Sequence, residues 1–310
     1  MKLSIIIPAY NCSKSILKCV GSIVSSSEKD YEIIVINDGS TDDTQIKLDA
    51  LSQQYKFIHT YQIKNSGVSA ARNIGIKYAQ GKYITFVDSD DYVDKNYVSK
   101  IIKSISSNRD LYLFCGQLVK RGVPQNVIYW IDCTQDDSID KLKTNIVRGK
   151  SNTPWDKVYK KKIIDDYSIA FRENVSLGED WIFSMDYTNR CSNFGLIEGV
   201  LYYYCFQDGS LSQQKMTLKM FENQFLLIDR LLKYGNSGIY SKHTALKLLT
   251  NSCSKLYRNG YSPDAIYSEL EKNTWYGEIL KTKYPDFKSK LRCILMKNKM
   301  IELISLIFCG

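Results

Sequence analysis

The chain has 310 residues, which suits one large domain or two small ones, and 44% of them are hydrophobic, enough to build a core. The net charge is +9, but no recognition motif accompanies this charge, so nucleic acid is a poor candidate partner. Nine cysteines without a C-x-x-C pair, and only two histidines, His59 and His243, argue against a zinc site. The odd number of cysteines and the lack of a signal peptide favour reduced thiols in a cytoplasmic protein.

Strand-like and helical patterns alternate along the chain up to about residue 90. Short apolar runs predict strands at residues 3–7, 31–36, 56–61 and 82–87. Helical spacing predicts three helices. One begins near Ser13, the second follows the capping residues Thr41 and Asp42, and the third covers residues 68–79. This order predicts an α/β fold with a doubly wound, mostly parallel sheet and right-handed crossovers.

The remainder of the chain changes character twice. A helix is predicted up to about Ser107, followed by strand-like runs at 110–119, 127–131 and 194–206, with helical segments at 139–147 and 181–189. From about residue 213 onward only helical patterns occur. The sequence therefore predicts an alternating first part, a mixed middle and a helical last third.

Three carboxylates stand directly behind the fourth predicted strand, at Asp88, Asp90 and Asp91. The carboxyl ends of strands face the crevice in which open α/β sheets bind their ligands. Asp88 and Asp90 alternate, so in an extended segment they point the same way and together can hold a hard divalent cation. The alternative is a solvated acidic turn, with Asp91 or Asp94 capping the next helix.

Ligand-type residues also follow the first strand. Pro8 lacks an N–H and is expected to end the ladder there. Tyr10 and Asn11 then present a flat ring and an amide at the crevice.

The second and third strands are followed by similar residues. Gly39 permits a tight turn that holds Asp38 toward a ligand, where its carboxylate suits the N–H edge of a uracil or thymine. Gly67 and the N–H groups of the next helix form a natural anion seat, and Arg72 lies one turn further on. Each segment alone is explained by turn chemistry, whereas four successive strand ends of this kind point to one ligand site.

A fifth segment, Gly178-Glu179-Asp180-Trp181, opens a helix far downstream. Asp180 is a candidate general base, because a carboxylate beside an aromatic ring can hold a sugar hydroxyl and take its proton. The alternative for Glu179 and Asp180 is a simple complement to the helix dipole.

Taken together, these segments resemble the family 2 glycosyltransferases, which have the Rossmann-like GT-A fold. The resemblance lies in SIIIPAYN (4–11), IVINDGSTD (34–42), NSG (65–67) with ARN (71–73), DSDD (88–91), WDKVY (155–159) and GED (178–180). It is closest to bacterial members that build surface polysaccharides, and it fades after about residue 212. It implies a GT-A domain at 1–212, with a nucleotide-binding half (1–95) and an acceptor and catalytic half (96–212), followed by the helical region 213–310.

The resemblance also implies roles by position. Asp38 would bind the base, Asp88 the ribose or sugar, and Asp90, with Asp88, the Mn²⁺ or Mg²⁺ ion that bridges the diphosphate. Asp180, with Glu179 beside it, would deprotonate the acceptor. The other expected donor contacts are Pro8, Tyr10, Asn11, Gly67, Arg72, Ser89, Trp155 and Lys157. Core packing is the alternative for Trp155, and a surface position the alternative for Lys157.

The activity that the resemblance implies is inverting transfer from a UDP- or dTDP-sugar to a hydroxyl of a glycan or lipid-linked oligosaccharide, in capsule, O-antigen or lipopolysaccharide synthesis. A non-catalytic sugar-nucleotide-binding subunit of a polysaccharide assembly complex is the alternative. A sugar-nucleotide pyrophosphorylase is disfavoured, because the loop after the first strand has neither Gly nor Arg. Phe206 and Gln207 stand where many relatives carry a basic residue, which argues against a phosphate clamp from that segment.

The C-terminal segment combines basic and apolar residues. Six lysines and one arginine crowd residues 281–299, and residues 300–308 are strongly apolar but shorter than the roughly 20 residues that span a bilayer. This pattern predicts contact with the inner face of the plasma membrane, or else a final helix docked on the protein.

Overall fold

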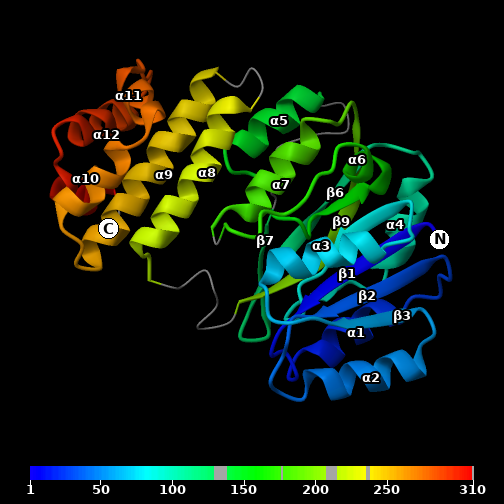
Figure 1. Cartoon of the computed structure of the whole chain (residues 1–310). Coiled ribbons are helices and arrows are strands. Elements are labelled where there is room, and N and C mark those ends of the chain that lie inside the picture. Colours follow the sequence, from blue (N-terminus) through cyan, green and yellow to red (C-terminus); the bar gives the residue numbers. More distant parts are fainter. Residues whose placement is uncertain (129–137, 176, 207–214, 235–237, 309–310) are drawn as a thin grey trace. The chain divides into compact units, whose positions relative to one another are not determined.

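The computed structural model describes residues 1–128, 138–175, 177–206, 215–234 and 238–308 (Figure 1). The chain forms two compact units. The first consists of residues 1–143, 151–173 and 183–208, and the second of residues 144–150, 174–182 and 209–310. The domain division at residue 212 stays a prediction.

One mixed sheet of nine strands, counted over the described residues, organises the first unit. Its strands run in the order β3-β2-β1-β4-β8-β6-β9-β5, and β7 pairs with β6. Their bounds are β1 Leu3–Ala9, β2 Tyr31–Asn37, β3 Ile58–Gln62, β4 Tyr83–Phe86, β5 Tyr92–Val93, β6 Leu111–Lys120, β7 Val123–Ile128, β8 Lys157–Lys160 and β9 Phe194–Phe206. The first four strands are parallel, whereas β4 and β6 both pair antiparallel with β8.

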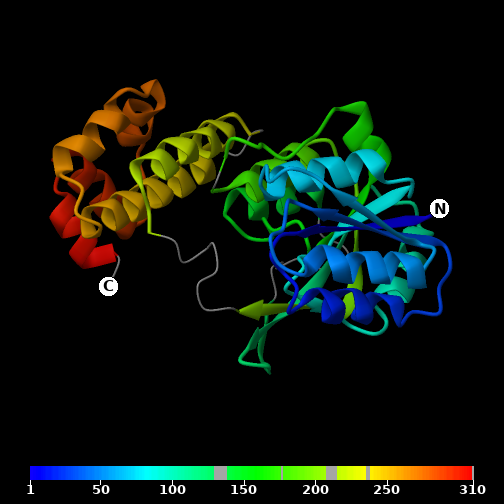
Figure 2. The ribbon, with the colours of Figure 1, turned by 60° about the horizontal axis from the view of Figure 1, so that its bottom comes forward.

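Helices cover both faces of the parallel strands, as Figure 2 shows for α1 and α2 on one face and α3 on the other. The helices of this unit are α1 Ile16–Val24, α2 Thr44–Gln54, α3 Val68–Tyr78, α4 Tyr97–Ile105 and α6 Lys161–Asp166. Helices α5 (Ile139–Val147) and α7 (Glu179–Thr188) each contribute residues to both units. The α/β fold with a doubly wound parallel part is therefore confirmed.

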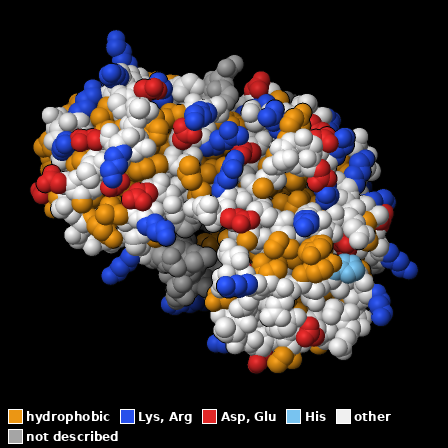
Figure 3. All heavy atoms as spheres, in the orientation of Figure 1, with side chains coloured by type: hydrophobic (Ala, Val, Ile, Leu, Met, Phe, Trp, Pro, Cys, Tyr) orange, Lys and Arg blue, Asp and Glu red, His pale blue; other side chains and the backbone are white. Residues whose placement is uncertain are grey.

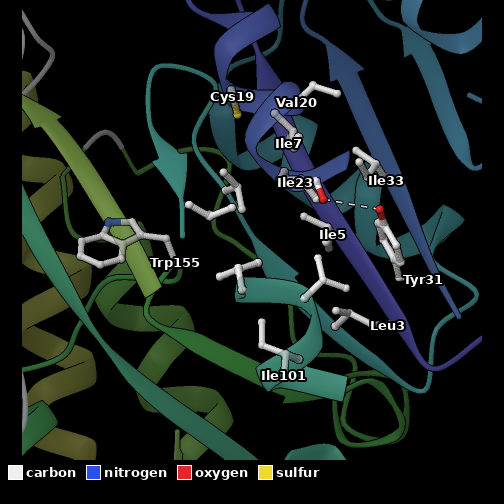
Figure 4. Close-up of a cluster of buried hydrophobic side chains, with 14 of the residues drawn as sticks. Leu3, Ile5, Ile7, Cys19, Val20, Ile23, Tyr31, Ile33, Ile101 and Trp155 are labelled. Carbon is white, nitrogen blue, oxygen red and sulfur yellow. Dashed lines mark hydrogen bonds between the residues drawn. The ribbon is translucent and has the colours of Figure 1, made fainter. Parts of the chain in front are cut away.

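The alternation of β1 explains this layering. Leu3, Ile5 and Ile7 lie on one face of the strand and pack with Cys19 and Val20 of α1, as Figure 4 shows. Ile6 points to the opposite face, where it meets Gly75 of α3. Because successive side chains of a strand point to opposite faces, a continuous apolar run such as β1 must be covered on both sides.

The second unit is helical and has its own core. It contains α8 Leu218–Lys233, α9 Gly238–Arg258, α10 Pro263–Glu271, α11 Thr274–Lys281, α12 Phe287–Lys297 and α13 Ile301–Phe308. Phe221, Leu249 and Ile279 are among its fully buried side chains. None of the helices in the described part of the chain has both the length and the apolar character needed to cross a membrane.

Some elements differ from the sequence prediction. The short strands β5 and β8 and the helix α6 were not predicted, because two to six residues carry too little periodicity to be recognised. Strand β7 starts at Val123, four residues before the predicted run, and residues 129–131 of that run lie outside the described residues.

Candidate active site

At the carboxyl edge of the sheet in the first unit, β1 stops pairing with β4 before it stops pairing with β2. Their register ends at Ile6 with Phe86, whereas β1 stays paired with β2 as far as Ala9 with Asn37. Pro8 therefore does not end the whole ladder, as the sequence suggested, but stands where β1 has already left β4. Asp88 follows two residues after this last pair, so it is carried to the carboxyl edge of the sheet.

The loops after β1 and β2 are fastened to each other. The side-chain oxygen of Asn11 accepts the N–H of Thr41 at 2.8 Å, and the N–H of Asn11 donates to the hydroxyl of Ser40 at 2.9 Å. Asn11 adopts a positive φ of 46°, which its short amide side chain tolerates well. Tyr10 beside it is 50% exposed, so its ring is open to a ligand.

Asp38 joins the second strand end to the third. Its carboxylate accepts the N–H of Ser66 at 2.7 Å and the N–H of Gly67 at 2.8 Å. Only 4% of Asp38 is exposed. The N–H of Gly67 is thus taken by the protein's own carboxylate and is not the free anion donor that the sequence predicted. A carboxylate offers about four acceptor positions, so Asp38 keeps capacity for the N–H of a base.

Arg72 connects α3 to the aspartate turn. Its guanidinium donates to Asp88 Oδ1 at 2.9 Å and lies 5.2 Å from the ring centre of Phe171. Arg72 is buried and Asp88 is partly exposed, so the pair presents its carboxylate side outward. A charge-assisted bond of this kind fixes the direction of the carboxylate.

The surroundings of Asp90 disfavour its ionised form. Burial, and then the charge of Asp88, raise its pKa to about 6. Among the described residues, no group of three or more His, Cys, Asp or Glu side chains forms a protein-only metal site. Ser89, between the two aspartates, hydrogen-bonds with the Cys12 thiol, whose pKa is raised by burial.

Asp91 has a structural position that the sequence did not reveal. It is 1% exposed, and its carboxylate accepts the Tyr202 hydroxyl and the Cys205 N–H, both at 2.6 Å. Burial and the charges of Asp88 and Asp90 hold its pKa well above the ordinary range. The helix-cap alternative for Asp91 is wrong, because α4 begins at Tyr97 with Asn96 at its N-cap. The only available signal was the run of tyrosines in the strand at 194–206.

Trp155 and Lys157 both lie in the core of the first unit. Trp155 is 3% exposed and stacks on Tyr202 with ring centres 4.3 Å apart and planes at 12°. Lys157 has no exposed surface, and its ammonium contacts Asp156 Oδ1 at 2.6 Å and the Thr153 carbonyl at 2.7 Å. The surface alternative for Lys157 is therefore wrong, and burial favours packing for Trp155.

Glu179 and Asp180 form the first turn of α7 and belong to the second unit. Gly178 precedes them with φ 96°, and a Cβ there would come within 2.6 Å of Leu227 Cδ2. Trp181 anchors the turn by donating its indole N–H to the Ile146 carbonyl at 2.7 Å. Their participation in one site with Asp38 and Asp90 of the first unit stays a prediction.

The remaining candidates are peripheral. His59 lies on β3 beside Glu32, and His243 faces Asp286 at 3.3 Å on the surface of the second unit. Phe206 ends β9 with the Lys120 ammonium 5.6 Å from its ring centre. Gln207, the other position where relatives carry a basic residue, lies outside the described residues.

The curated proteins that this chain resembles include bacterial glycosyltransferases. GlyA, a glycosyltransferase of Streptococcus pneumoniae, is 27% identical over 286 residues, which are 87% of this chain and 40% of GlyA. TarS, a poly(ribitol-phosphate) beta-N-acetylglucosaminyltransferase of Staphylococcus aureus, is 27% identical over 209 residues, 66% of this chain and 35% of TarS. The chain thus spans well under half the length of these two relatives.

Solved structures agree on the fold. TarS 1-349 of Staphylococcus aureus in complex with UDP-GlcNAc superposes with a TM-score of 0.76 at 20% identity, over 99% of this chain and 91% of that one. The mannosyltransferase PcManGT of Pyrobaculum calidifontis, in complex with GDP-Man and Mn²⁺, gives 0.55 at 12% identity, over 100% and 88%. These likenesses establish the GT-A fold.

A sequence model described as Glycosyl transferase family 2 matches residues 4–168, more than half of the chain. The match includes the four strand ends that carry Asn11, Asp38, Gly67 and Asp88. The chain therefore belongs to glycosyltransferase family 2.

Proposed function

We propose that this protein transfers a sugar, with inversion, from a nucleoside diphosphate sugar to a hydroxyl of a glycan or lipid-linked oligosaccharide during bacterial surface polysaccharide synthesis. The observation that carries the proposal is that Asp38 follows β2 while Asp88, paired with Arg72, and Asp90 follow β4, so that all three stand at the carboxyl edge of the same parallel strands. A UDP- or dTDP-sugar is the proposed donor, supported by the UDP-GlcNAc complex of TarS and by the acceptor capacity of Asp38.

The donor contacts divide by chemistry. Tyr10 offers an exposed ring on which a base can stack, and Asp38 offers an acceptor for its N–H. Asp88, directed by Arg72, would accept hydroxyls of the ribose or sugar. Pro8, Asn11, Gly67 and Ser89 shape the loops around these groups.

The aspartate turn fits a divalent cation. Asp88 and Asp90 are close enough for the charge of one to raise the pKa of the other, and a cation relieves such repulsion. Mg²⁺ and similar ions are commonly held by one or two carboxylates together with substrate phosphates, which suits a site without a third protein ligand among the described residues. When bound, Mn²⁺ or Mg²⁺ would neutralise charge on the leaving diphosphate.

Asp180 is the proposed general base. Its carboxylate would take the proton of the acceptor hydroxyl as that oxygen attacks the anomeric carbon opposite the diphosphate, which inverts the configuration. Glu179 beside it would orient the acceptor. Trp155 and Lys157 would act from the core, Lys157 by neutralising Asp156 and Trp155 through its stacking partner.

The decisive experiment separates binding from transfer. A thermal-shift panel of UDP-, dTDP- and GDP-sugars, with and without Mn²⁺, identifies the donor, because a ligand at a hundredfold its Kd stabilises by about 2.7 kcal/mol. Asp180→Asn should keep the donor shift and lose about 10²- to 10⁴-fold in transfer. Asp166→Asn, an exposed carboxylate of α6 paired with Lys162, is the control and should transfer normally.

Two results would contradict the proposal. Full transfer by Asp180→Asn removes the base assignment. A wild-type protein that binds a donor and transfers to no glycan or lipid-linked acceptor favours the alternative of a non-catalytic binding subunit.

The proposal extends to location. A lipid-linked acceptor would be met at the inner face of the plasma membrane, with the basic C-terminal segment as the contact. Large apolar side chains that are exposed on α12 and α13, including Phe287, Ile294 and Leu306, support this contact.

A further inference from the structure

One hydroxyl in β9 holds both ends of the aspartate turn. The Tyr202 hydroxyl donates to Asp91 Oδ2 at 2.6 Å and accepts the backbone N–H of Asp88 at 3.0 Å. Within the turn, the N–H of Asp91 bonds the carbonyl of Asp88 at 3.1 Å. A phenol has one proton to donate and lone pairs to accept, so a single oxygen atom serves both contacts.

The tyrosine itself has little freedom. Tyr202 is fully buried, and its ring stacks on Trp155 at 4.3 Å. Trp155 packs in turn on Gly116 of β6, where a Cβ would lie 2.6 Å from Trp155 Cζ3. Cys205, three residues after Tyr202 in β9, donates its N–H to Oδ1, the other carboxylate oxygen of Asp91. The hydroxyl is therefore fixed by the sheet, and the turn is fixed by the hydroxyl.

We infer that Tyr202 is a positioning residue, which sets the direction of Asp88 and Asp90 toward the cation and diphosphate through its bonds to Asp88 and Asp91. The inference rests on the proposed function, since it takes Asp88 and Asp90 as the ligand-facing carboxylates. Partners one bond removed from metal ligands commonly change metal affinity about 10- to 100-fold when they are removed. The same inference gives Trp155 a packing role. Trp155 holds the ring of Tyr202 and does not stack on a sugar.

The test removes one oxygen atom. Mn²⁺ is titrated into the full chain with saturating UDP, and free Mn²⁺ is read by electron paramagnetic resonance. Tyr202→Phe keeps the ring on Trp155 and should weaken Mn²⁺ binding by about 10- to 100-fold. Tyr203→Phe is the matched control, because the ring of Tyr203 stacks on Tyr92 on the other side of the strand, and it should bind Mn²⁺ as the wild type does.

The outcomes distinguish the inference from the function on which it rests. Wild-type binding of Mn²⁺ together with equal binding by Tyr202→Phe overturns the positioning role alone. Equal weakening in Tyr202→Phe and Tyr203→Phe also overturns it, because the effect is then one of general packing. Absence of Mn²⁺ binding in the wild type overturns the cation assignment, and the inference with it.

A second variant covers a folding failure of Tyr202→Phe. Asp91→Asn keeps the shape of the side chain. An amide nitrogen in place of Oδ2 is a donor and cannot accept the Tyr202 hydroxyl, so that hydroxyl loses the bond that holds it beside the N–H of Asp88. The inference expects the same loss of Mn²⁺ affinity, with cooperative thermal unfolding retained. Unchanged Mn²⁺ affinity in this variant contradicts the inference.

Discussion

At the scale of single residues, neighbouring carboxylates of one turn have different tasks. Asp88 is paired with Arg72, Asp90 is half-buried and forms no ion pair with another part of the chain that the structure describes, and Asp91 is buried against Tyr202. The differences come from the surroundings and not from residue type, because all three are aspartates within four positions. Burial, and then the charge of Asp88, disfavour the ionised form of Asp90, a cost in stability that the proposed cation would relieve.

This cost predicts that Asp90→Asn stabilises the cation-free protein. The pKa of Asp90 rises from 3.8 to about 6 on folding, so the folded state resists ionisation of this group. The contribution of Asp90 to the stability of the folded protein is complete below pH 3.8, the pKa in the unfolded chain. It is lost as the pH rises through 6, the pKa in the folded protein. At about 1.4 kcal/mol for each pKa unit, the variant should gain about 1–3 kcal/mol at pH 8.

Urea denaturation at several pH values with a chelator checks this. The gain should shrink as the pH falls from 7 toward 4, because the wild-type carboxyl then takes up a proton in the folded protein and loses its unfavourable charge. A gain that is the same at pH 4 and pH 8 contradicts the pKa shift. Added Mn²⁺ should raise the free energy of unfolding of the wild type more than that of the variant.

At the scale of elements, the close approach of α3 to β1 sets the site. Arg72 and Gly75 belong to the same helix, and Gly75 lies against Ile6, the last residue of β1 that pairs with β4. A side chain at Gly75 would move the helix outward and carry Arg72 away from Asp88. The glycine is required by space and not by backbone conformation, since it is helical.

Gly75→Ala is therefore expected to destabilise the protein by about 1–3 kcal/mol, because the added Cβ overlaps Ile6 Cγ2 and the core must shift. Gly21→Ala is the matched control, a helical glycine of α1 whose added Cβ meets nothing within 4 Å. It should stabilise by about 0.5–1 kcal/mol through helix propensity. Chemical denaturation measures both, and a destabilised Gly21→Ala would remove the contrast.

The sequence predicted most of the longer helices and strands, but it did not predict which strands pair with which. The four parallel strands, α3 and α8 were recognised from periodicity, which is local and repeats along the chain. Strand β8 escaped because it has four residues, two of them lysines, and becomes a strand only between β4 and β6. Neighbours that distant in the chain leave no periodic signal.

At the scale of the whole molecule, charge and exposed apolar surface gather near the C-terminus. Phe287 is 76% exposed and Ile294 54% on α12, and Leu306 is 74% and Ile307 51% on α13. Phe287, Lys290, Ile294 and Lys297 follow helical spacing, so apolar and basic side chains share one face of α12. Figure 3 shows Lys and Arg side chains (blue) interspersed with hydrophobic ones (orange) on the molecular surface.

This surface predicts binding to anionic vesicles. The full chain should sediment with phosphatidylglycerol vesicles, less so at high salt, and should leave phosphatidylcholine vesicles unbound. The double variant Leu306→Ser/Ile307→Ser should bind at least about tenfold more weakly, since each burial contributes about 1.5–3 kcal/mol. Leu226→Ser on α8, which removes a side chain that is 53% exposed, is the control and should bind normally.

Absence of vesicle binding by the wild type, or binding that ignores lipid charge, would contradict the membrane contact. Self-association measured without lipid would assign the same surface to a second copy of the chain.

The sequence by itself determined the α/β class, the parallel strand–helix order, the ligand-type residues at four strand ends and the family to which the chain belongs. All of these are local patterns, because strand, turn and motif are written within a few consecutive residues. Only the tertiary structure decided which aspartate is buried, that Gly67 serves Asp38, and that Lys157 lies in the core. Those outcomes depend on partners such as Tyr202, which is 111 residues from Asp91, and burial at such a distance is set by how the chain folds back on itself.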